Sequence, residues 1–222
     1  MAETAPSIAL VGPYPPIRGG ISQHAARLAA AFTQAGSDVT VVSWRSQYPG
    51  FLYPGDQPPV DPDLLTHSLR WWSVPSWWRA RDSIENADVV VFPWVSPVHA
   101  LPLRVMVGSA QQRVVTIVHN AAPHEALPLS DVSMRWLLNK VDGIVAHSGA
   151  VEAALRGIIG DREIHVVPLP SNLTLGPTAL PTGPPRLLFF GYIRPYKGVD
   201  LLIETLAALR RRGHDLPTTI AG

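Results

Sequence analysis

Two cations and a glycine stand together near the end of the chain, between an apolar block and a run with helical spacing. Arg194 and Lys197 occupy the loop, and Gly198 leads into the helix. Backbone N–H groups at a helix N-terminus attract anions, and neighbouring cations strengthen that attraction. Both side chains could instead be solvated loop cations, but their joint placement favours a ligand that carries phosphate.

A second loop with the same potential follows the first apolar block of the chain. It runs from Gly12 to the pair Gly19 and Gly20, which Arg18 precedes. Adjacent glycines let the backbone approach a ligand closely, and the arginine adds positive charge. The spacing is not Gly-x-Gly-x-x-Gly, so it does not indicate a nicotinamide cofactor. An ordinary strand-to-helix turn is the alternative interpretation.

A histidine forms the third candidate. His119 and Asn120 directly follow an apolar strand pattern, and His124 and Glu125 come close behind. A histidine at the end of a strand can bond a substrate hydroxyl or a phosphate oxygen, or act as an acid or base. It can equally be a loop histidine bonded to local backbone. These residues do not have the spacing of a known metal site. His147 follows a later strand in the same way, and we expect it to be structural.

Tryptophans and arginines form a fourth feature between residues 70 and 81. Four tryptophans lie within eight residues, and three arginines flank them: Trp71, Trp72, Trp77 and Trp78, with Arg70, Arg79 and Arg81. Aromatic side chains beside basic ones can dock on a membrane interface. The same residues can equally belong to the core or to a lid.

The elements that must position these residues alternate along the chain. Strands are expected at 8–11, 39–42, 89–92, 114–118, 143–146, 164–167, 187–190 and 218–221. Helices are expected at 21–32, 77–84, 98–110, 131–140, 150–159 and 199–209. The long stretch 43–75 is expected to be irregular. Strands that are apolar throughout and separated by helices predict an α/β fold with a doubly wound parallel sheet. Ligands of such sheets bind at the carboxyl ends of the strands, where the candidate residues lie.

Prolines interrupt this alternation once. Five of them fall between residues 168 and 184, together with two glycines, and this composition is typical of a linker. We therefore predict a first domain over residues 1–170, a proline-rich linker over 171–185, and an incomplete second domain over 186–222.

The composition excludes several classes of protein. The 222 residues are 46% hydrophobic and 16% charged, which is enough apolar material for a sizeable core. The absence of cysteine excludes disulfides and thiolate chemistry. A net charge of +1 does not indicate a nucleic-acid-binding surface. Without a signal peptide or a membrane-span pattern, we expect a cytoplasmic protein, with room for peripheral contact at the inner face of the membrane.

Three of these segments together resemble the family 4 glycosyltransferases, which are retaining enzymes of the GT-B fold. The shared features are the first loop, ending in Arg18, Gly19 and Gly20, the strand that runs into His119 and Asn120, and the run from Phe190 to Leu202. The run, Phe-Gly-Tyr-Ile-Arg-Pro-Tyr-Lys-Gly-Val-Asp-Leu-Leu, is the most specific of the three. The resemblance extends over the whole chain and is loose between residues 45 and 110.

The resemblance implies two Rossmann-like domains, with the acceptor on the N-terminal one and a nucleotide-sugar donor on the C-terminal one. Gly19 and Gly20 would lie near the donor diphosphate, His119 would contact the donor sugar or stabilise the reaction centre, and Arg194 and Lys197 would hold the diphosphate. No metal and no cofactor are expected, because the cations would stabilise the leaving group. The acceptor could be lipid-linked, a small molecule or a polysaccharide.

The family also carries a Glu-x7-Glu motif in its donor domain, and this motif would lie beyond residue 222. Glu204 does not replace it. The expectation is therefore a chain truncated within its C-terminal domain that catalyses no appreciable transfer by itself. Two other interpretations stay open: a non-catalytic α/β module that binds a nucleotide or a partner, and an unrelated doubly wound enzyme such as a phosphatase or an oxidoreductase.

Overall fold

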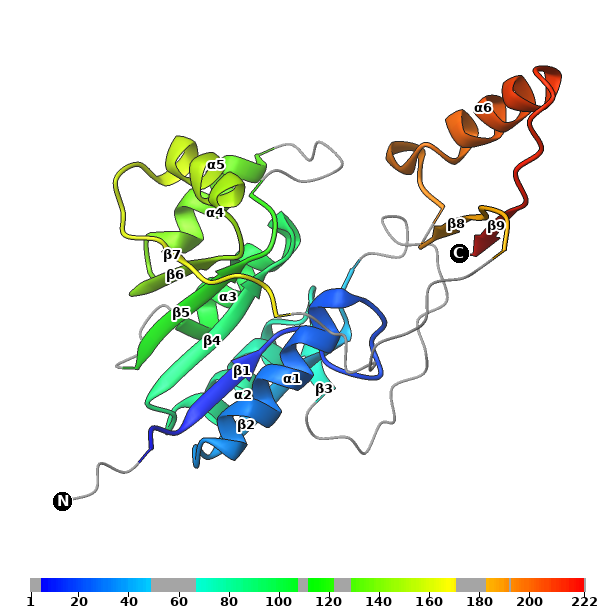
Figure 1. The fold of residues 1–222 in the computed structure, drawn as a ribbon. Coiled ribbons are helices and arrows are strands. Elements are labelled where there is room, and N and C mark those ends of the chain that lie inside the picture. Colours follow the sequence, from blue (N-terminus) through cyan, green and yellow to red (C-terminus); the bar gives the residue numbers. More distant parts are fainter. Residues whose placement is uncertain are drawn as a thin grey trace. The chain divides into compact units, whose positions relative to one another are not determined.

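A computed structural model describes residues 5–48, 67–107, 112–121, 129–170, 183–191 and 193–221. The chain divides into two compact units, Met1–Pro170 and Ser171–Gly222, which we describe separately. Figure 1 shows the elements of each.

A parallel sheet of seven strands forms the centre of the first unit. Its order is β3-β2-β1-β4-β5-β6-β7, and every pair of neighbours is parallel. The strands are β1 (Ile8–Val11), β2 (Val39–Ser46), β3 (His67–Arg70), β4 (Val89–Trp94), β5 (Arg113–Val118), β6 (Gly143–Ala146) and β7 (His165–Val166). The chain builds outward from β1 in one direction and then from β4 in the other. The order therefore reverses between β1 and β4, which confirms the predicted doubly wound sheet.

Helices cover both faces of this sheet (Figure 1). They are α1 (Gly20–Gln34), α2 (Val74–Ile84), the 3₁₀ turn η1 (Pro97–His99), α3 (Ala100–Val107), α4 (Ser130–Leu138) and α5 (Gly149–Ile159). Ala29, Leu28 and Phe32 of α1 pack on one face, against Ile8, Leu10, Val91 and Ile117. Helices α2 to α5 contribute to a larger core on the other face. Two apolar layers thus cover the two faces of the sheet.

The prediction of an irregular stretch over residues 43–75 is wrong at both ends of this range. Strand β2 continues through Trp44 to Ser46, β3 occupies His67–Arg70, and α2 begins at Val74. Residues 49–66 lie outside the described part. Trp44 and Leu69 are fully buried, although the pairing of β2 with β3 shifts register twice. An edge strand with an irregular register has no continuous apolar block, so its sequence pattern is weak.

The second unit contains one strand–helix–strand motif. It comprises β8 (Leu187–Phe190), the 3₁₀ turn η2 (Pro195–Lys197), α6 (Val199–Arg211) and β9 (Thr218–Ala221), and the two strands pair in parallel. These elements match those expected from the sequence. Within the described residues of this unit no side chain is buried, and Phe190 is 84% exposed. So small a motif encloses little apolar surface.

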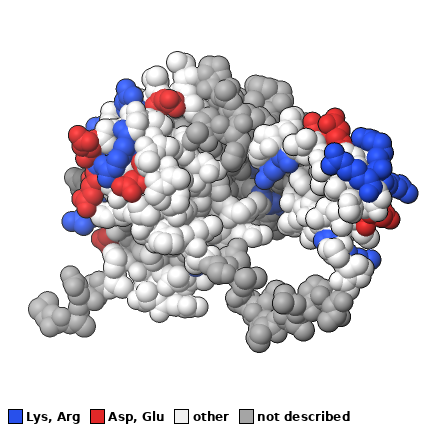
Figure 2. Space-filling model, turned by 45° about the horizontal axis from the view of Figure 1, so that its top comes forward, with Lys and Arg blue, Asp and Glu red and all other residues white. Residues whose placement is uncertain are grey.

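On the face of the molecule that Figure 2 shows, most of the described surface carries no Lys, Arg, Asp or Glu. Figure 2 shows lysine and arginine side chains interspersed with aspartate and glutamate, separated by broad neutral areas. Within the ranges that the structure describes, no helix is both long enough and apolar enough to cross a membrane.

Candidate functional site at the carboxyl edge of the sheet

The loop after β1 lies close to the switch point of the sheet, which is the place between β1 and β4 where the strand order reverses. A Cβ atom added at Gly12 would lie 2.7 Å from the Pro93 ring, so only glycine lets β1 and β4 leave the sheet this close together. Gly19 is the N-cap of α1 with a φ of 135°, a conformation that other residues rarely adopt. No side chain caps the helix, and a Cβ at Gly20 would meet nothing within 4 Å. The first backbone N–H groups of α1 therefore have no side-chain cap among the described residues.

A mainly apolar pocket lies between α1 and the ends of β1, β4 and β5. Its polar lining includes Tyr14, His24 and His119, and the remainder consists of side chains such as Ile21 and Ile117. The position agrees with the rule that ligands of doubly wound sheets bind at the switch point. His119 lies where the sequence predicts it, in the first position after β5.

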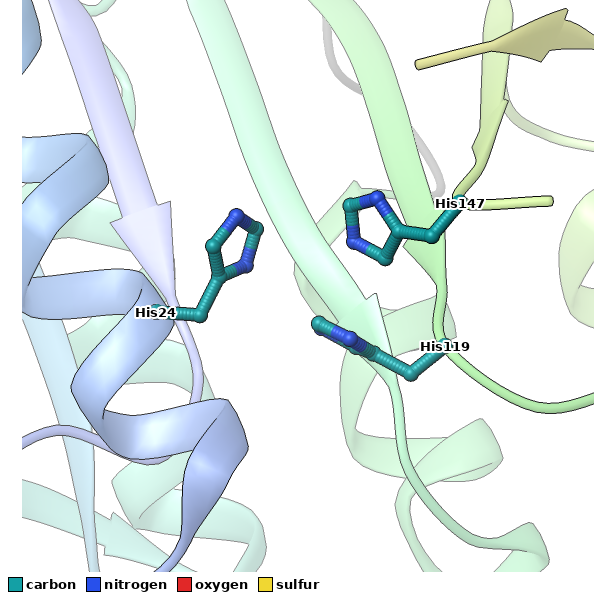
Figure 3. Close-up of side chains that lie close together, drawn as sticks. All are labelled: His24, His119 and His147. Carbon is teal, nitrogen blue, oxygen red and sulfur yellow. The ribbon is translucent and has the colours of Figure 1, made fainter. Parts of the chain in front are cut away.

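Two further histidines surround His119 (Figure 3). His147 is the first residue after β6, whose last residue pairs with the last residue of β5, so the two side chains start from neighbouring strand ends. Their ring centroids are 4.7 Å apart. His24 extends from α1, with ring centroids 5.2 Å from His119 and 5.1 Å from His147. We call His24, His119 and His147 the histidine cluster.

Burial favours the uncharged form of two members of the cluster, His119 and His24. Burial, followed by the neighbouring His147 and His24, lowers the pKa of His119 to about 4. Burial also lowers the pKa of His24, followed by His147 and Arg27. At neutral pH His119 is thus an uncharged imidazole. It can exchange hydrogen bonds with a hydroxyl, but it brings no positive charge to a phosphate.

His147 has a defined tautomer. Its Nδ1 lies 2.8 Å from the carbonyl oxygen of Val167, and since a carbonyl only accepts, Nδ1 must carry the proton. The Nε2 atoms of His147 and His119 are both buried with no hydrogen-bond partner among the described residues. Sequence reasoning predicted a structural role for His147 and did not consider His24. The signal for His147 was its position after a parallel strand, which is the same as that of His119.

The cations of the second unit sit at the turn before α6. Arg194 is the N-cap of η2, and Lys197 ends that turn with its Nζ 5.3 Å from the Tyr196 ring centroid. Gly198, the N-cap of α6, has a φ of 67° and no side chain to compete for the helix N-terminus. The arrangement suits an anion. Asn120 is exposed beside His119, whereas His124 and Glu125 lie outside the described residues.

The tryptophan group divides between core and surface. Trp77 is buried and its Nε1 donates to the carbonyl of Arg70 at 2.8 Å, and Trp71 packs partly buried against the same core. Trp72 and Trp78 are 58% and 49% exposed. Each has an arginine over its ring, Arg70 at 5.8 Å and Arg81 at 5.2 Å. Neither the core nor the surface interpretation therefore applies to the whole group.

Comparison with a family model identifies the family of this chain. The model described as Glycosyltransferase Family 4 matches residues 18–174. The chain belongs to glycosyltransferase family 4. The match includes Gly19, Gly20 and the histidine cluster, and it ends before Arg194 and Lys197. Membership excludes the third interpretation, an unrelated phosphatase or oxidoreductase.

Solved structures agree on the fold of this family 4 chain. A sucrose-phosphate synthase from Thermosynechococcus elongatus superposes with a TM-score of 0.65 at 12% identity, over 97% of this chain and 70% of that one. An α-glucosyltransferase in complex with UDP-glucose and DNA containing an abasic site gives 0.62 at 11% identity, over 97% and 67%. The same enzyme type with UDP and a 13-mer DNA gives 0.59 at 11% identity, over 98% and 67%. No curated protein matches the chain.

This likeness shows the fold alone. The first unit is the Rossmann-like domain of a GT-B glycosyltransferase, as the sequence predicts. The family 4 chain spans about two thirds of the length of these structures.

Proposed function

We propose that the protein takes part in transfer of a sugar from a nucleotide-diphosphate donor to an acceptor, with retention of anomeric configuration. The observation that carries this proposal is the position of His119, at the switch point of a family 4 domain and beside the open N-terminus of α1. The acceptor enters from the first unit, and the donor is held mainly by the second. The acceptor class, whether lipid-linked, small-molecule or polysaccharide, is left open.

His119 acts on the sugar and not on the phosphate. Its neutral imidazole suits a hydroxyl of the donor sugar at the reaction centre. No aspartate or glutamate lines the described pocket, so retention is proposed to arise from attack on the leaving-group side and not through a carboxylate nucleophile. Gly19 and Gly20 bring the backbone of α1 to the diphosphate.

Arg194 and Lys197 hold the diphosphate as negative charge develops on it. Fixed cations aimed at a developing charge stabilise the transition state, so no metal is needed at the diphosphate. The donor class is supported by the related fold of an α-glucosyltransferase that was solved with UDP and with UDP-glucose.

Titration with UDP, ADP and GDP, followed by calorimetry, tests the cation site. We expect one of these nucleotides to bind, and Arg194→Gln or Lys197→Gln to weaken binding at least tenfold, because each removes a charge-assisted bond. Arg211→Gln is the matched control, since Arg211 lies at the opposite end of α6. Absence of binding by a folded chain, or equal losses in all three variants, contradicts the proposal.

A non-catalytic α/β module that binds a nucleotide or a partner is the second candidate. The exposure of the second unit favours it, since Leu188 and Phe190 are 68% and 84% exposed. Such a module would bind a nucleoside diphosphate and still give no product in the presence of any partner that completes the donor domain. Product formation in that reconstituted mixture would exclude it.

We also propose that the protein works in the cytoplasm, with peripheral contact at the inner membrane face through Trp72 and Trp78. Exposed indoles beside Arg70 and Arg81 suit the interface of an anionic bilayer. Co-sedimentation with vesicles containing phosphatidylglycerol is expected to fall in Trp78→Ala. Equal sedimentation of this variant and the parent would count against the contact.

A further inference from the structure

We infer that the histidine cluster is a binding site for one transition-metal ion of the Zn²⁺ class, held by His24, His119 and His147. This inference does not rest on the proposed function. It goes against the expectation that the protein binds no metal, which came from the diphosphate chemistry of the second unit. The ion would bind in the first unit, and it would have no part in holding the diphosphate.

The first argument is the convergence of ligands. One ring nitrogen from each histidine can be chosen so that all three lie within 4.8 Å of one another. Three imidazoles with an open fourth position form a common type of zinc site. Zn–N bonds of about 2.0–2.1 Å place tetrahedral ligands roughly 3.3 Å apart, so the ligand nitrogens must approach one another by up to about 1.5 Å around the ion. Small rotations of side chains that already face one another can supply this (Figure 3).

The second argument is the state of the nitrogen atoms. A metal binds to a nitrogen lone pair, and because Nδ1 of His147 donates to the carbonyl of Val167, Nε2 is the nitrogen of this ring that can bind an ion. A ligand histidine whose other nitrogen donates to a backbone carbonyl is the usual outer arrangement of metal sites. The Nε2 atoms of His119 and His147 are buried without a partner among the described residues, which is costly unless something else binds them.

The third argument is charge. Among the described residues no carboxylate lines the adjoining pocket, and all three candidate ligands are imidazole nitrogens. A neutral nitrogen set selects Zn²⁺, Cu²⁺, Ni²⁺ or Co²⁺ over Mg²⁺ and Ca²⁺, which prefer oxygen ligands. Since the ion would use the free nitrogen of His119, it would compete with any hydroxyl that bonds there.

Metal titration of the full chain without a histidine tag tests the site. We expect one equivalent of Zn²⁺ by calorimetry, and one equivalent of Co²⁺ with the visible absorption of a four-coordinate ion. Mg²⁺ should not compete. No saturable binding at micromolar ion, or a six-coordinate Co²⁺ spectrum, overturns the inference.

Variants locate the ion. His24→Gln and His147→Gln are each expected to weaken binding at least tenfold, because each removes one of three ligands. His165→Gln is the matched control, since His165 is an exposed histidine on β7. Unchanged affinity in both cluster variants, or an equal loss in the control, overturns the assignment. If circular dichroism shows that a variant does not fold, the Co²⁺ spectrum of the parent decides whether a four-coordinate site is present.

This test and the nucleotide titration fail independently. Nucleoside diphosphates probe Arg194 and Lys197 in the second unit, whereas the ion probes the histidine cluster in the first. Loss of either result leaves the other proposal standing.

Discussion

At the scale of single residues, His99 shows how burial ties stability to pH. Its ring is 1% exposed, stacks on Trp44 at 4.5 Å between centroids, and its Nε2 lies 2.8 Å from the carbonyl oxygen of Gln47. The carbonyl only accepts, so Nε2 carries a proton. Burial lowers the pKa of His99 from 6.5 to about 4, against the opposing effect of the Gln47 bond.

This shift predicts a loss of stability in acid. Between pH 6.5 and 4 the unfolded chain binds a proton at His99 and the folded chain does not, so the free energy of unfolding falls as pH falls. The full loss is about 3 kcal/mol, and it is complete below pH 4. Urea unfolding at a series of pH values measures the slope.

His99→Phe isolates the contribution of this residue. The variant keeps an aromatic ring beside Trp44 but loses the bond to Gln47, which costs about 1–2 kcal/mol at pH 7. Its stability is then expected to fall less steeply than that of the parent between pH 6.5 and 4. His24 and His119 keep their own acid sensitivity in both proteins, so only the difference between the two slopes is attributed to His99. Parallel curves would contradict the assignment.

At the scale of elements, α2 places two neighbouring tryptophans in different environments, one in the core and one at the surface. Trp77 faces the core and its Nε1 donates to Arg70 at the end of β3, whereas Trp78 lies half exposed on the outer side. The Ser76 hydroxyl also contacts that carbonyl, at 3.4 Å. Hydrogen bonds from Ser76 and Trp77 thus attach the start of α2 to the end of the edge strand β3. The short turn at residues 71–73 brings these side chains back to Arg70.

A matched pair of variants checks this division. Trp77→Phe is expected to lower the free energy of unfolding by about 1–3 kcal/mol, because it removes a buried hydrogen bond and part of a packed ring. Trp78→Phe, which makes the same chemical change at the surface, should stay within about 0.5 kcal/mol of the parent. Denaturant unfolding measures both. Equal effects would show that α2 does not anchor β3 through Trp77.

At the scale of the whole molecule, one complete sheet is joined to one small motif. The first unit buries apolar side chains on both faces of seven strands, while the second consists of two strands and α6, with no buried side chain among its described residues. A donor site needs residues held to a fraction of an ångström by packing around them. The second unit by itself provides little of that packing.

We therefore expect the 222-residue chain alone to give no appreciable transfer. Incubation with UDP-, ADP- and GDP-sugars, followed by detection of released nucleoside diphosphate, measures this. Turnover above the rate of a His119→Ala control would contradict the expectation. Nucleotide binding without turnover would agree with it, because the anion site that we propose at Arg194 and Lys197 lies within one turn and needs no complete domain.

Local patterns predicted most of the fold. Apolar blocks such as residues 89–92 and helical spacing such as that of 199–209 are sufficient to indicate buried parallel strands and covering helices. The pattern failed at residues 43–46 and 67–70, because strands that pair with an irregular register leave little periodic signal. A predicted strand also predicts where that strand ends, so the position of His119 at the carboxyl edge of the sheet was predictable as well.

The sequence by itself thus determined the type and order of the elements, and the glycines and polar residues that follow the strands. Only the tertiary structure decided which of these residues meet. His24, His119 and His147 come together because β5 pairs with β6 and α1 covers the adjoining face, and both relations depend on packing between segments far apart in the chain. Short-range periodicity carries no information about such pairings, since it records only which side of an element is apolar.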